Sequence, residues 1–464
     1  MQRALLVNPP IYDFAAYDLW ARPLGLLYVA AALERQGREV RIIDCLDRFH
    51  PSIRDVGGKH GPRSRNYGTG SYYWREAEKP AVYDYVPRVY KRFGLPEEIL
   101  RREIAAGPKP DFIGITSGMT YWYLGVAEAV RICREVWPGV EIVLGGIYAT
   151  LCAGHAERVV KPDTIVRGGG MDRSPTGQGR GPGVANSLPA YHLLSHLPAT
   201  AILTGSGCPF ACAYCASKIL APKLERRPVQ QVADEIELYR RRFNIADIAF
   251  YDDALLWDTE DHIKPILREV ISRNLGARFH TPNGLHARMI DAELARLMRE
   301  AGFVTIRLSL ETVSREGQAS WDHKVRYDEF LAAVAYLKSA GFSAENLGAY
   351  VMAGTPDESP SDPLSAIAAA HAAGVGVRLA EYSPIPGTAD FERARAAAAV
   401  DITEPLLQNN TVAPIGGLEG FKRHQVLKSV VQKLNDALLS GQVLVTPKEA
   451  IEDGVKALER AGVM

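Results

Sequence analysis

Short apolar strands alternate with helical runs along most of this 464-residue chain, which limits the folds open to it. In the N-terminal part, strands are expected at 3–7, 39–43, 111–116 and 140–144, with helices over 23–35 and 124–136. Further along, strands are expected near 200–204, 246–251, 277–281, 303–309, 347–352 and 376–381. Strands that alternate with helices form parallel sheets. We therefore expect an α/β protein: a doubly wound, Rossmann-like N-terminal sheet, then a partial (β/α)6 barrel and a helical C-terminal tail.

Changes in composition set the expected domain boundaries. Residues 46–110 interrupt the first series with many glycines, arginines and tyrosines, and we interpret them as an ordered insertion. Glycine and proline concentrate between 168 and 188, as is typical of a linker. The expected parts are an N-terminal domain at 1–168, a linker at 169–197, a barrel at 198–395 and a helical region at 396–464.

The charge balance argues against nucleic acid as a partner. Lys plus Arg and Asp plus Glu number 54 each, and we find no basic stripe with interleaved aromatic residues. No apolar run reaches the roughly 18 residues that a membrane span needs. The first apolar run is too short for a signal peptide and breaks at Pro9 and Pro10. We expect a cytoplasmic protein with no membrane span.

Three of the six cysteines crowd into one short segment. Cys208, Cys212 and Cys215 form a Cys-x-x-x-Cys-x-x-Cys pattern directly after the first strand of the second series. Three thiolates on one loop can hold a four-iron four-sulfur cluster and leave one iron open to another molecule. The alternative is a structural zinc ion, which requires a fourth Cys or His, and the sequence has no second cysteine pair. The remaining cysteines lie in apolar surroundings and are not expected to bind metal: Cys45, Cys133 and Cys152.

This spacing, with the aromatic Tyr214 before the last cysteine, resembles that of the radical S-adenosylmethionine (SAM) superfamily. The resemblance extends over 198 to about 390 and implies a [4Fe-4S] cluster on Cys208, Cys212 and Cys215 as the catalytic centre. In that family the open iron binds the amino and carboxylate groups of SAM. An electron from the cluster then splits SAM into methionine and a 5′-deoxyadenosyl radical. An external electron donor such as flavodoxin or ferredoxin is therefore implied.

Polar residues at the ends of the later strands are the candidate SAM ligands. Sites in parallel barrels lie at the C-terminal ends of the strands. By the resemblance, Asp252 and Asp253 stand where the family keeps the Gly-Gly-Glu region that receives the SAM ammonium, although the literal tripeptide is absent. Glu311 stands where a polar residue meets the ribose. The other candidates from this set are Tyr214, Asn283 and Gly354. His280 and His286 flank the third strand end, where a structural role is favoured but either could reach substrate.

Residues 3–168 resemble the cobalamin-binding domain that is fused to a large subgroup of radical SAM enzymes. The residues that carry this resemblance lie in loops at the carboxyl edge of the expected sheet, where doubly wound folds bind ligands, and small residues there let a flat macrocycle approach the backbone. They are Asn8, Pro9, Pro10, Pro23, Gly25, Ser117, Gly118, Met119, Thr120, Gly145, Gly146, Gly168 and Gly169. A flavodoxin-like domain that binds a nucleotide, or nothing, would place similar residues at those turns. The loop after the first strand contains no histidine, so we expect no protein histidine on the lower face of the cobalamin.

Together these features predict a cobalamin-dependent radical SAM enzyme with SAM, a [4Fe-4S] cluster and cobalamin as cofactors. The expected reaction is methylation of an unactivated carbon of a small molecule, through the adenosyl radical and methylcobalamin. One alternative is a cyclase or rearrangement enzyme with the same cofactors. Another is a corrinoid-binding sensor. The sequence does not identify the substrate.

Overall fold

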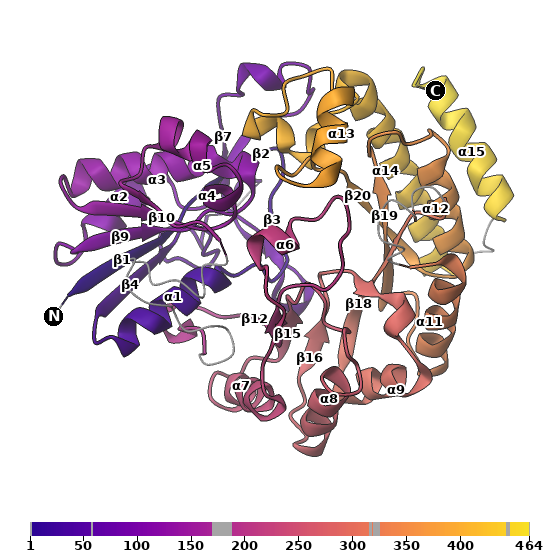
Figure 1. The fold of residues 1–464 in the computed structure, drawn as a ribbon, viewed down its shortest axis with the longest axis horizontal. Helices are drawn as coiled ribbons and strands as arrows, with labels where there is room; N and C mark the ends of the chain where they lie inside the picture. The colour runs from indigo at the N-terminus through magenta and orange to yellow at the C-terminus, as the bar shows by residue number, and fades with distance from the viewer. Residues whose placement is uncertain are drawn as a thin grey trace. The chain divides into compact units, whose positions relative to one another are not determined.

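The computed structural model describes residues 2–56, 59–168, 188–314, 318, 325–441 and 446–463. The chain divides into two compact units (Figure 1). The N-terminal unit comprises Met1–Ala201, Ile219–Arg227 and Glu404–Leu406, and the C-terminal unit comprises Ile202–Lys218, Pro228–Thr403 and Leu407–Met464.

The N-terminal unit is built on a parallel sheet. Its strands are β1 (Arg3–Asn8), β4 (Glu39–Asp44), β9 (Phe112–Ile115), β10 (Glu141–Leu144) and β11 (Thr164–Ile165). They pair in the order β11-β10-β9-β1-β4, and every pair is parallel. Along the chain, β4 is added on one side of β1, and β9, β10 and β11 are then added on the other side. A doubly wound sheet with this reversal binds ligands at the carboxyl ends of the strands beside it.

Helices cover both faces of this sheet, with α1 on one side and α2 and α3 on the other (Figure 1). Their bounds are α1 (Leu24–Arg35), α2 (Glu97–Ala105), α3 (Tyr123–Val136), α4 (Ile147–Leu151) and α5 (Ala153–His155). In α1, the buried Leu26, Ala30 and Leu33 follow a spacing of four and three residues, and they pack on Leu6 and Phe112 of the sheet. The helical period thus places one apolar stripe of α1 against the strands. The α/β class and the parallel N-terminal sheet expected from the sequence are confirmed.

Short strands from the segment between β4 and α2 pair antiparallel with two strands that precede α1. β2 (Ile11–Asp13), β8 (Lys91–Phe93) and β7 (Trp74–Glu76) form one small sheet; β3 (Tyr17–Asp18), β6 (Gly70–Ser71) and β5 (Arg63–Ser64) form another. Four tyrosines of this segment are buried: Tyr72, Tyr73, Tyr83 and Tyr90.

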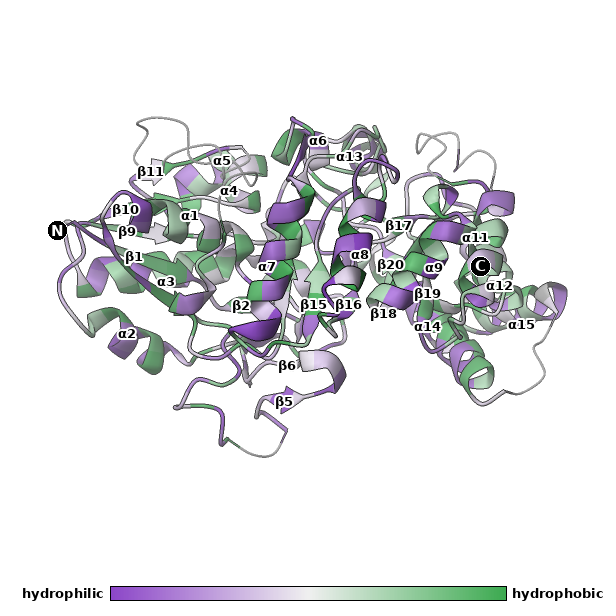
Figure 2. Ribbon diagram, turned by 90° about the horizontal axis from the view of Figure 1, so that it is seen from below, coloured by the Kyte–Doolittle hydropathy of each residue, from purple (hydrophilic) through white to green (hydrophobic). Residues whose placement is uncertain are grey.

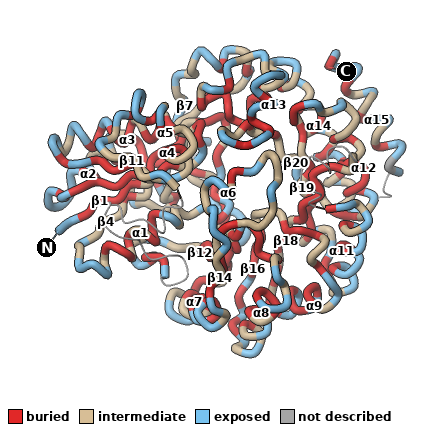
Figure 3. The backbone as a smooth tube through the Cα atoms, in the orientation of Figure 1, coloured by how far each residue is buried: buried red, intermediate tan, exposed pale blue. Residues whose placement is uncertain are grey.

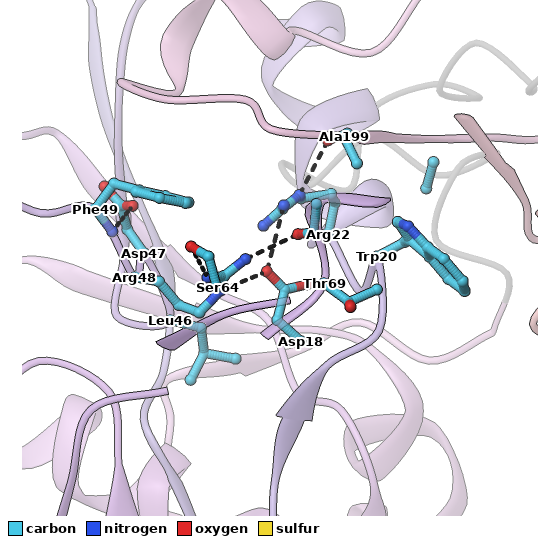
Figure 4. Close-up of polar contacts among 12 residues, drawn as sticks. Asp18, Trp20, Arg22, Leu46, Asp47, Arg48, Phe49, Ser64, Thr69 and Ala199 are labelled. Atoms are coloured by element: carbon cyan, nitrogen blue, oxygen red, sulfur yellow. Dashed lines mark hydrogen bonds and ion pairs between the residues drawn. The ribbon is translucent and has the colours of Figure 1, made fainter. Parts of the chain in front are cut away.

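A buried arginine connects this segment to β3 (Figure 4). Arg48 donates from Nε to Asp18 Oδ2 at 2.9 Å, and both side chains are almost fully buried. Its other nitrogens donate to the backbone oxygens of Arg63 and Gly68 and to Ser64 Oγ. Because one guanidinium satisfies several separated groups at once, Arg48 fixes the path of the segment.

The C-terminal unit has a second parallel sheet. Its strands are β12 (Thr200–Ile202, of which Ile202 belongs to this unit), β15 (Asp247–Phe250), β16 (Arg278–His280), β18 (Phe303–Glu311), β19 (Leu347–Ala353) and β20 (Gly376–Glu381). They pair in chain order, and the short β17 (Leu285–His286) pairs with β18. The strand pairs from β15 to β20 are parallel. Neighbours that follow chain order are the topology of a (β/α) barrel.

Helices follow the strands of this sheet: α7 (Val229–Arg241), α8 (Ile263–Ser272), α9 (Ala292–Ala301), α11 (Tyr327–Ser339) and α12 (Asp362–Ala372). Hydrophobic and hydrophilic residues separate onto different faces of α7 and α8 (Figure 2), and the strands are buried (Figure 3). Gly302 ends α9 with φ at +103°, where a Cβ would lie 2.3 Å from the carbonyl oxygen of Ala277. The turn from α9 into β18 therefore requires glycine.

Three helices complete the chain: α13 (Ala389–Ala397), α14 (Gly417–Leu439) and α15 (Pro447–Arg460). On α14, Asn435 accepts from the backbone N–H of Val377 at 2.8 Å and donates to its carbonyl at 2.9 Å. A side chain of the helix thus pairs with β20, the last strand in the order, as a neighbouring strand would. None of the helices in the described ranges is long and apolar enough to cross a membrane.

Candidate functional site

The three clustered cysteines lie in the loop that follows β12 and β13 (Gly205–Ser206). Cys208 and Cys212 are half-buried, Cys215 is exposed, and none of the three is in a disulfide. The N–H of Cys215 donates to the carbonyl of Cys212 at 3.0 Å, which folds the end of the loop into a turn. Across the described ranges, no three His, Cys, Asp or Glu side chains meet as ligands of one metal ion. A cluster held by three thiolates has each sulfur on a different iron. Three thiols outside disulfides on one loop fit the donor set of such a cluster.

An aromatic side chain holds this loop on the sheet. The Phe210 ring, between the first two cysteines, stacks on His286 with centroids 4.2 Å apart and meets Trp257 edge-on at 5.5 Å. The Arg288 guanidinium lies over the same ring, 4.9 Å from its centroid. Stacking and cation–π contacts of this kind each contribute about 0.5–1.5 kcal/mol. His286 therefore has a packing role beneath the loop, and His280 is buried between Asp247 and Thr305.

The two aspartates after β15 contact different parts of the loop. The Asp252 carboxylate is buried and accepts from the N–H and hydroxyl of Thr204 and from the N–H of Gly205. Asp253 keeps an exposed edge, but its surroundings desolvate the carboxyl and raise its pKa, which a hydrogen bond from Ser217 partly offsets. Asp252 thus shapes the strand end before the cysteines, and Asp253 lies near the residues after them.

Asn283 and Glu311 lie at the ends of β16 and β18. The Asn283 amide donates to the carbonyls of Tyr251 and Asp252 at 3.0 and 3.2 Å, so it ties two strand ends together. Glu311 is buried and has φ at +58°, where the pairing register of β18 with β19 is irregular. A non-glycine residue in the left-handed region carries strain, and such strain concentrates at functional sites.

Tyr214 lies near Glu311 and Cys212, and Gly354 packs against His424. Burial raises the pKa of Tyr214 well above its usual value, and the nearby Glu311 and Cys212 raise it further. The phenol therefore stays protonated beside the loop. A Cβ on Gly354 would lie 2.6 Å from Nε2 of His424, a residue of α14. Close packing against His424 therefore explains why residue 354 is a glycine.

A pocket opens at the carboxyl edge of the N-terminal sheet, with about 910 Å³ of empty space when its open mouth is included. Its walls are mostly apolar, from Leu6, Phe112 and Val143 of the strands and Leu26 and Val29 of α1. Four predicted residues line it: Gly25, Gly145, Gly146 and Gly168.

Gly25 and Gly145 leave space that the protein does not fill, and so does Gly168. Among the residues that the structure describes, no heavy atom lies within 4 Å of the position of a Cβ on Gly25 or Gly145. By contrast, a Cβ on Gly146 would lie 2.3 Å from the carbonyl oxygen of Ser117. Protein packing requires glycine at 146 but not at 25 or 145. Small residues at these two positions fit a pocket whose ligand approaches the backbone closely.

The remaining predicted residues of this domain support the pocket or lie beside it. Ser117 Oγ donates to the carbonyl of Gly145 at 2.7 Å and accepts from the N–H of Ala149, and the carbonyl of Pro10 packs against Gly125 of α3. Of the described residues that line the pocket, none is among Asn8, Pro9, Pro10, Pro23, Ser117, Gly118, Met119 and Thr120. Gly169 lies outside the described residues.

Sequence reasoning missed part of the lining. Thr150 donates to the carbonyl of Gly146 at 2.8 Å and accepts from the N–H of Gly168 at 3.2 Å, so it links two glycine turns. Val143 and Val166 look like ordinary strand core in the sequence. Thr116 could have been predicted, because it directly follows β9 and precedes Ser117 at the same strand end.

Comparison with known proteins gives a consistent set of relatives. Residues 202–377 match the radical SAM superfamily. The cytidylyl-2-hydroxyethylphosphonate methyltransferase of Streptomyces wedmorensis is 23% identical over 94% of this chain and 89% of its own. An uncharacterised methyltransferase of Pyrococcus horikoshii is 24% identical over 76% of this chain and 84% of its own.

Among solved structures, the chain is similar to TsrM, a radical SAM methyltransferase from Kitasatospora setae. With tryptophan and a SAM analogue bound, TsrM gives a TM-score of 0.61 at 17% identity, over 86% of this chain and 78% of that one. With cobalamin and a [4Fe-4S] cluster bound, it gives 0.59 at 18% identity, over 86% and 76%. At this identity the likeness establishes the fold.

Proposed function

Since residues 202–377 belong to the radical SAM superfamily, we propose that this enzyme depends on cobalamin and methylates an unactivated carbon of a small molecule. The observation that carries the proposal is the combination of two sites in one chain. One is the loop with three accessible thiols, and the other is the apolar pocket with unfilled glycine positions.

On the C-terminal unit, Cys208, Cys212 and Cys215 would hold the [4Fe-4S] cluster. Bound there, the cluster would supply the electron that cleaves SAM, and it would take that electron from an external donor such as flavodoxin or ferredoxin. Phe210 orients the loop through its stacking on His286. Glu311 and Asn283 lie at strand ends of the same unit, where SAM-binding groups of a parallel barrel are expected.

On the N-terminal unit, the pocket would hold part of the cobalamin, which supplies the methyl group. Gly25 and Gly145 leave room for a flat ring to approach the backbone, and the strand and helix side chains offer it an apolar wall. A nucleotide would favour charged or hydrogen-bonding groups over this lining, so the pocket supports a corrinoid better.

Methyl transfer is supported by the relatives. The two curated relatives described above and TsrM are named methyltransferases, and the Streptomyces protein aligns along nearly the whole chain. The named relatives act on different substrates, so they support the reaction class and no particular substrate.

The cluster is tested by anaerobic purification and reconstitution with iron and sulfide. We expect about four irons per chain in the wild type and loss of the cluster absorbance in Cys212→Ala, with loss of SAM cleavage under dithionite. Cys133→Ala is the matched control, because that thiol is buried in the other unit and should leave iron loading intact. A Cys212→Ala protein that keeps the cluster and cleaves SAM would refute the assignment.

The cobalamin site is tested with Gly145→Leu, which fills the pocket without meeting a described protein atom at Cβ. We expect hydroxocobalamin binding to fall at least tenfold while the melting temperature stays near that of the wild type. Gly154→Leu is the control, since Gly154 is exposed and outside the pocket lining. Unchanged binding in Gly145→Leu would place the corrinoid elsewhere.

Products separate methylation from rearrangement. A methyltransferase of this class should release both S-adenosylhomocysteine and 5′-deoxyadenosine from SAM, and a labelled SAM methyl should appear in the product. If 5′-deoxyadenosine forms alone and the product carries no label, the enzyme is a cyclase or a rearrangement enzyme instead.

A further inference from the structure

We propose that the Ser217 hydroxyl donates a hydrogen bond to the sulfur of Cys215 in the loaded enzyme and raises the reduction potential of the cluster, and that Asp253 competes for this hydroxyl proton. The inference rests on the proposed function only in requiring that Cys215 ligates a cluster. Ser217 is therefore a positioning and tuning residue that touches a ligand rather than the reacting atoms.

The geometry around Cys215 supports two donors to one sulfur. Ser217 Oγ lies 3.2 Å from Cys215 Sγ, and the backbone N–H of Ser217 donates to the same sulfur at 3.4 Å. Ser217 is the first residue of the short helix α6 (Ser217–Leu220), so its position relative to Cys215 is set by the local turn. Both distances are within the range of hydrogen bonds to sulfur.

Cluster ligation decides the direction of the side-chain bond. In a free thiol either atom can donate, but a cysteine that binds iron does so as a thiolate and has no proton to give. The Ser217 hydroxyl then becomes the donor. Hydrogen bonds to the sulfurs are among the factors that set the potential of an iron–sulfur cluster. They stabilise the reduced cluster more, because it carries one more negative charge.

Asp253 offers the same hydroxyl a second acceptor. Its carboxyl forms a side-chain hydrogen bond with Ser217. A serine hydroxyl has one proton and can serve only one acceptor at a time. While the proton points to the Asp253 carboxylate, Cys215 retains only the backbone N–H of Ser217. The carboxylate thus lowers the potential in two ways: by withdrawing the hydrogen bond and by its negative charge.

The test measures the midpoint potential of the reconstituted cluster without SAM, by redox titration followed by electron paramagnetic resonance. Loss of one hydrogen bond in Ser217→Ala should lower the equilibrium constant for one-electron reduction by about tenfold, a shift of about 59 mV to lower potential. Ser217→Thr keeps the hydroxyl and should stay near the wild-type value. Asp253→Asn should raise the potential, because an amide can donate to Ser217 Oγ and leave the hydroxyl proton for the sulfur.

The double variant isolates the competition. If Asp253 acts partly through Ser217, then Asp253→Asn should raise the potential less in the Ser217→Ala background than in the wild type. Ser217→Ala at the wild-type potential, or an equal effect of Asp253→Asn in both backgrounds, would overturn the inference while leaving the cluster assignment in place. If Ser217→Ala does not load, the shift in Asp253→Asn decides, and a shift to lower potential refutes the proposal. Failure of the wild type itself to load a cluster would refute the proposed function and this inference together.

Discussion

Thr204 donates both its backbone N–H and its hydroxyl to the carboxylate of Asp252, with distances of 2.9 and 2.6 Å to Oδ1. The two residues are 48 positions apart, and each follows a strand of the same sheet. Gly205 gives the same oxygen a further N–H at 2.9 Å. Asp252 therefore clamps the strand end from which the cysteine loop departs.

Removing this clamp should disturb the loop. Asp252→Ala leaves the buried N–H groups of Thr204 and Gly205 without their acceptor, at a cost of about 1–3 kcal/mol for each unsatisfied group. We expect a lower melting temperature and incomplete iron loading, measured by calorimetry and iron content. Asp261→Ala, at an exposed position, is the control and should match the wild type. Wild-type stability and loading in Asp252→Ala would show that the clamp is dispensable.

The buried cysteines should resist modification in the folded protein. Burial raises the pKa of the Cys133 thiol to about 12 and raises that of Cys45 well above its usual value. Since the thiolate is the reactive form, both should stay unlabelled by iodoacetamide at pH 8 while the exposed Cys215 of the apoprotein reacts. Mass spectrometry of digested protein distinguishes the sites, and urea should make Cys133 reactive. Labelling of native Cys133 at the rate of Cys215 would contradict its burial.

His280 should make the C-terminal unit less stable in mild acid. Burial lowers its pKa, and the hydrogen bond to Asp247 offsets this only in part. The unfolded chain, with an ordinary histidine pKa of about 6.5, then binds a proton that the folded chain does not, so stability is present above that pH and falls below it. We expect the melting temperature of the wild type to fall more steeply than that of His280→Gln between about pH 7.5 and 5.5. A constant difference across this range would show that His280 does not contribute.

The glycine pair at the end of β10 should respond unequally to alanine. At Gly146, φ is +100° and a Cβ would lie 2.3 Å from the carbonyl oxygen of Ser117, so Gly146→Ala combines about 1–2 kcal/mol of backbone strain with a direct clash. Gly145→Ala meets no described atom within 4 Å and should fold like the wild type. Thermal unfolding compares the two variants. Equal melting temperatures would contradict the tight contact between the two loops.

The long strands of both sheets could be predicted because their apolar runs are continuous and separated by helical periods. β15 at Asp247–Phe250 and β20 at Gly376–Glu381 lie within the expected ranges. β17 could not be predicted, since two residues show no period, and its pairing with β18 depends on the fold around it. The same holds for β3, β5 and β6, whose register depends on contacts such as that of Arg48 with Asp18.

In the candidate site, too, some residues could be predicted from the sequence and others could not. The cysteine loop could be identified because its chemistry is carried by spacing within eight residues. The hydrogen bonds of Asp252 with Thr204 and of Asn283 with Tyr251 join residues from different strands, and only the folded sheet brings them together. The pocket wall at Val143 could not be distinguished from core, because an apolar strand residue looks the same whether a side chain or a ligand covers it.

The pairing of Asn435 with Val377 has a consequence for any shortened form of this protein. A chain cut to the superfamily-matched segment 202–377 would lose α14 and all of β20 after Val377, the residue that Asn435 covers. The backbone groups left bare at this edge of the sheet, on β19 and the remnant of β20, could then pair with the same edge of another molecule. We expect such a fragment to aggregate. In the full chain, α14 covers this edge and prevents the pairing of one molecule with another.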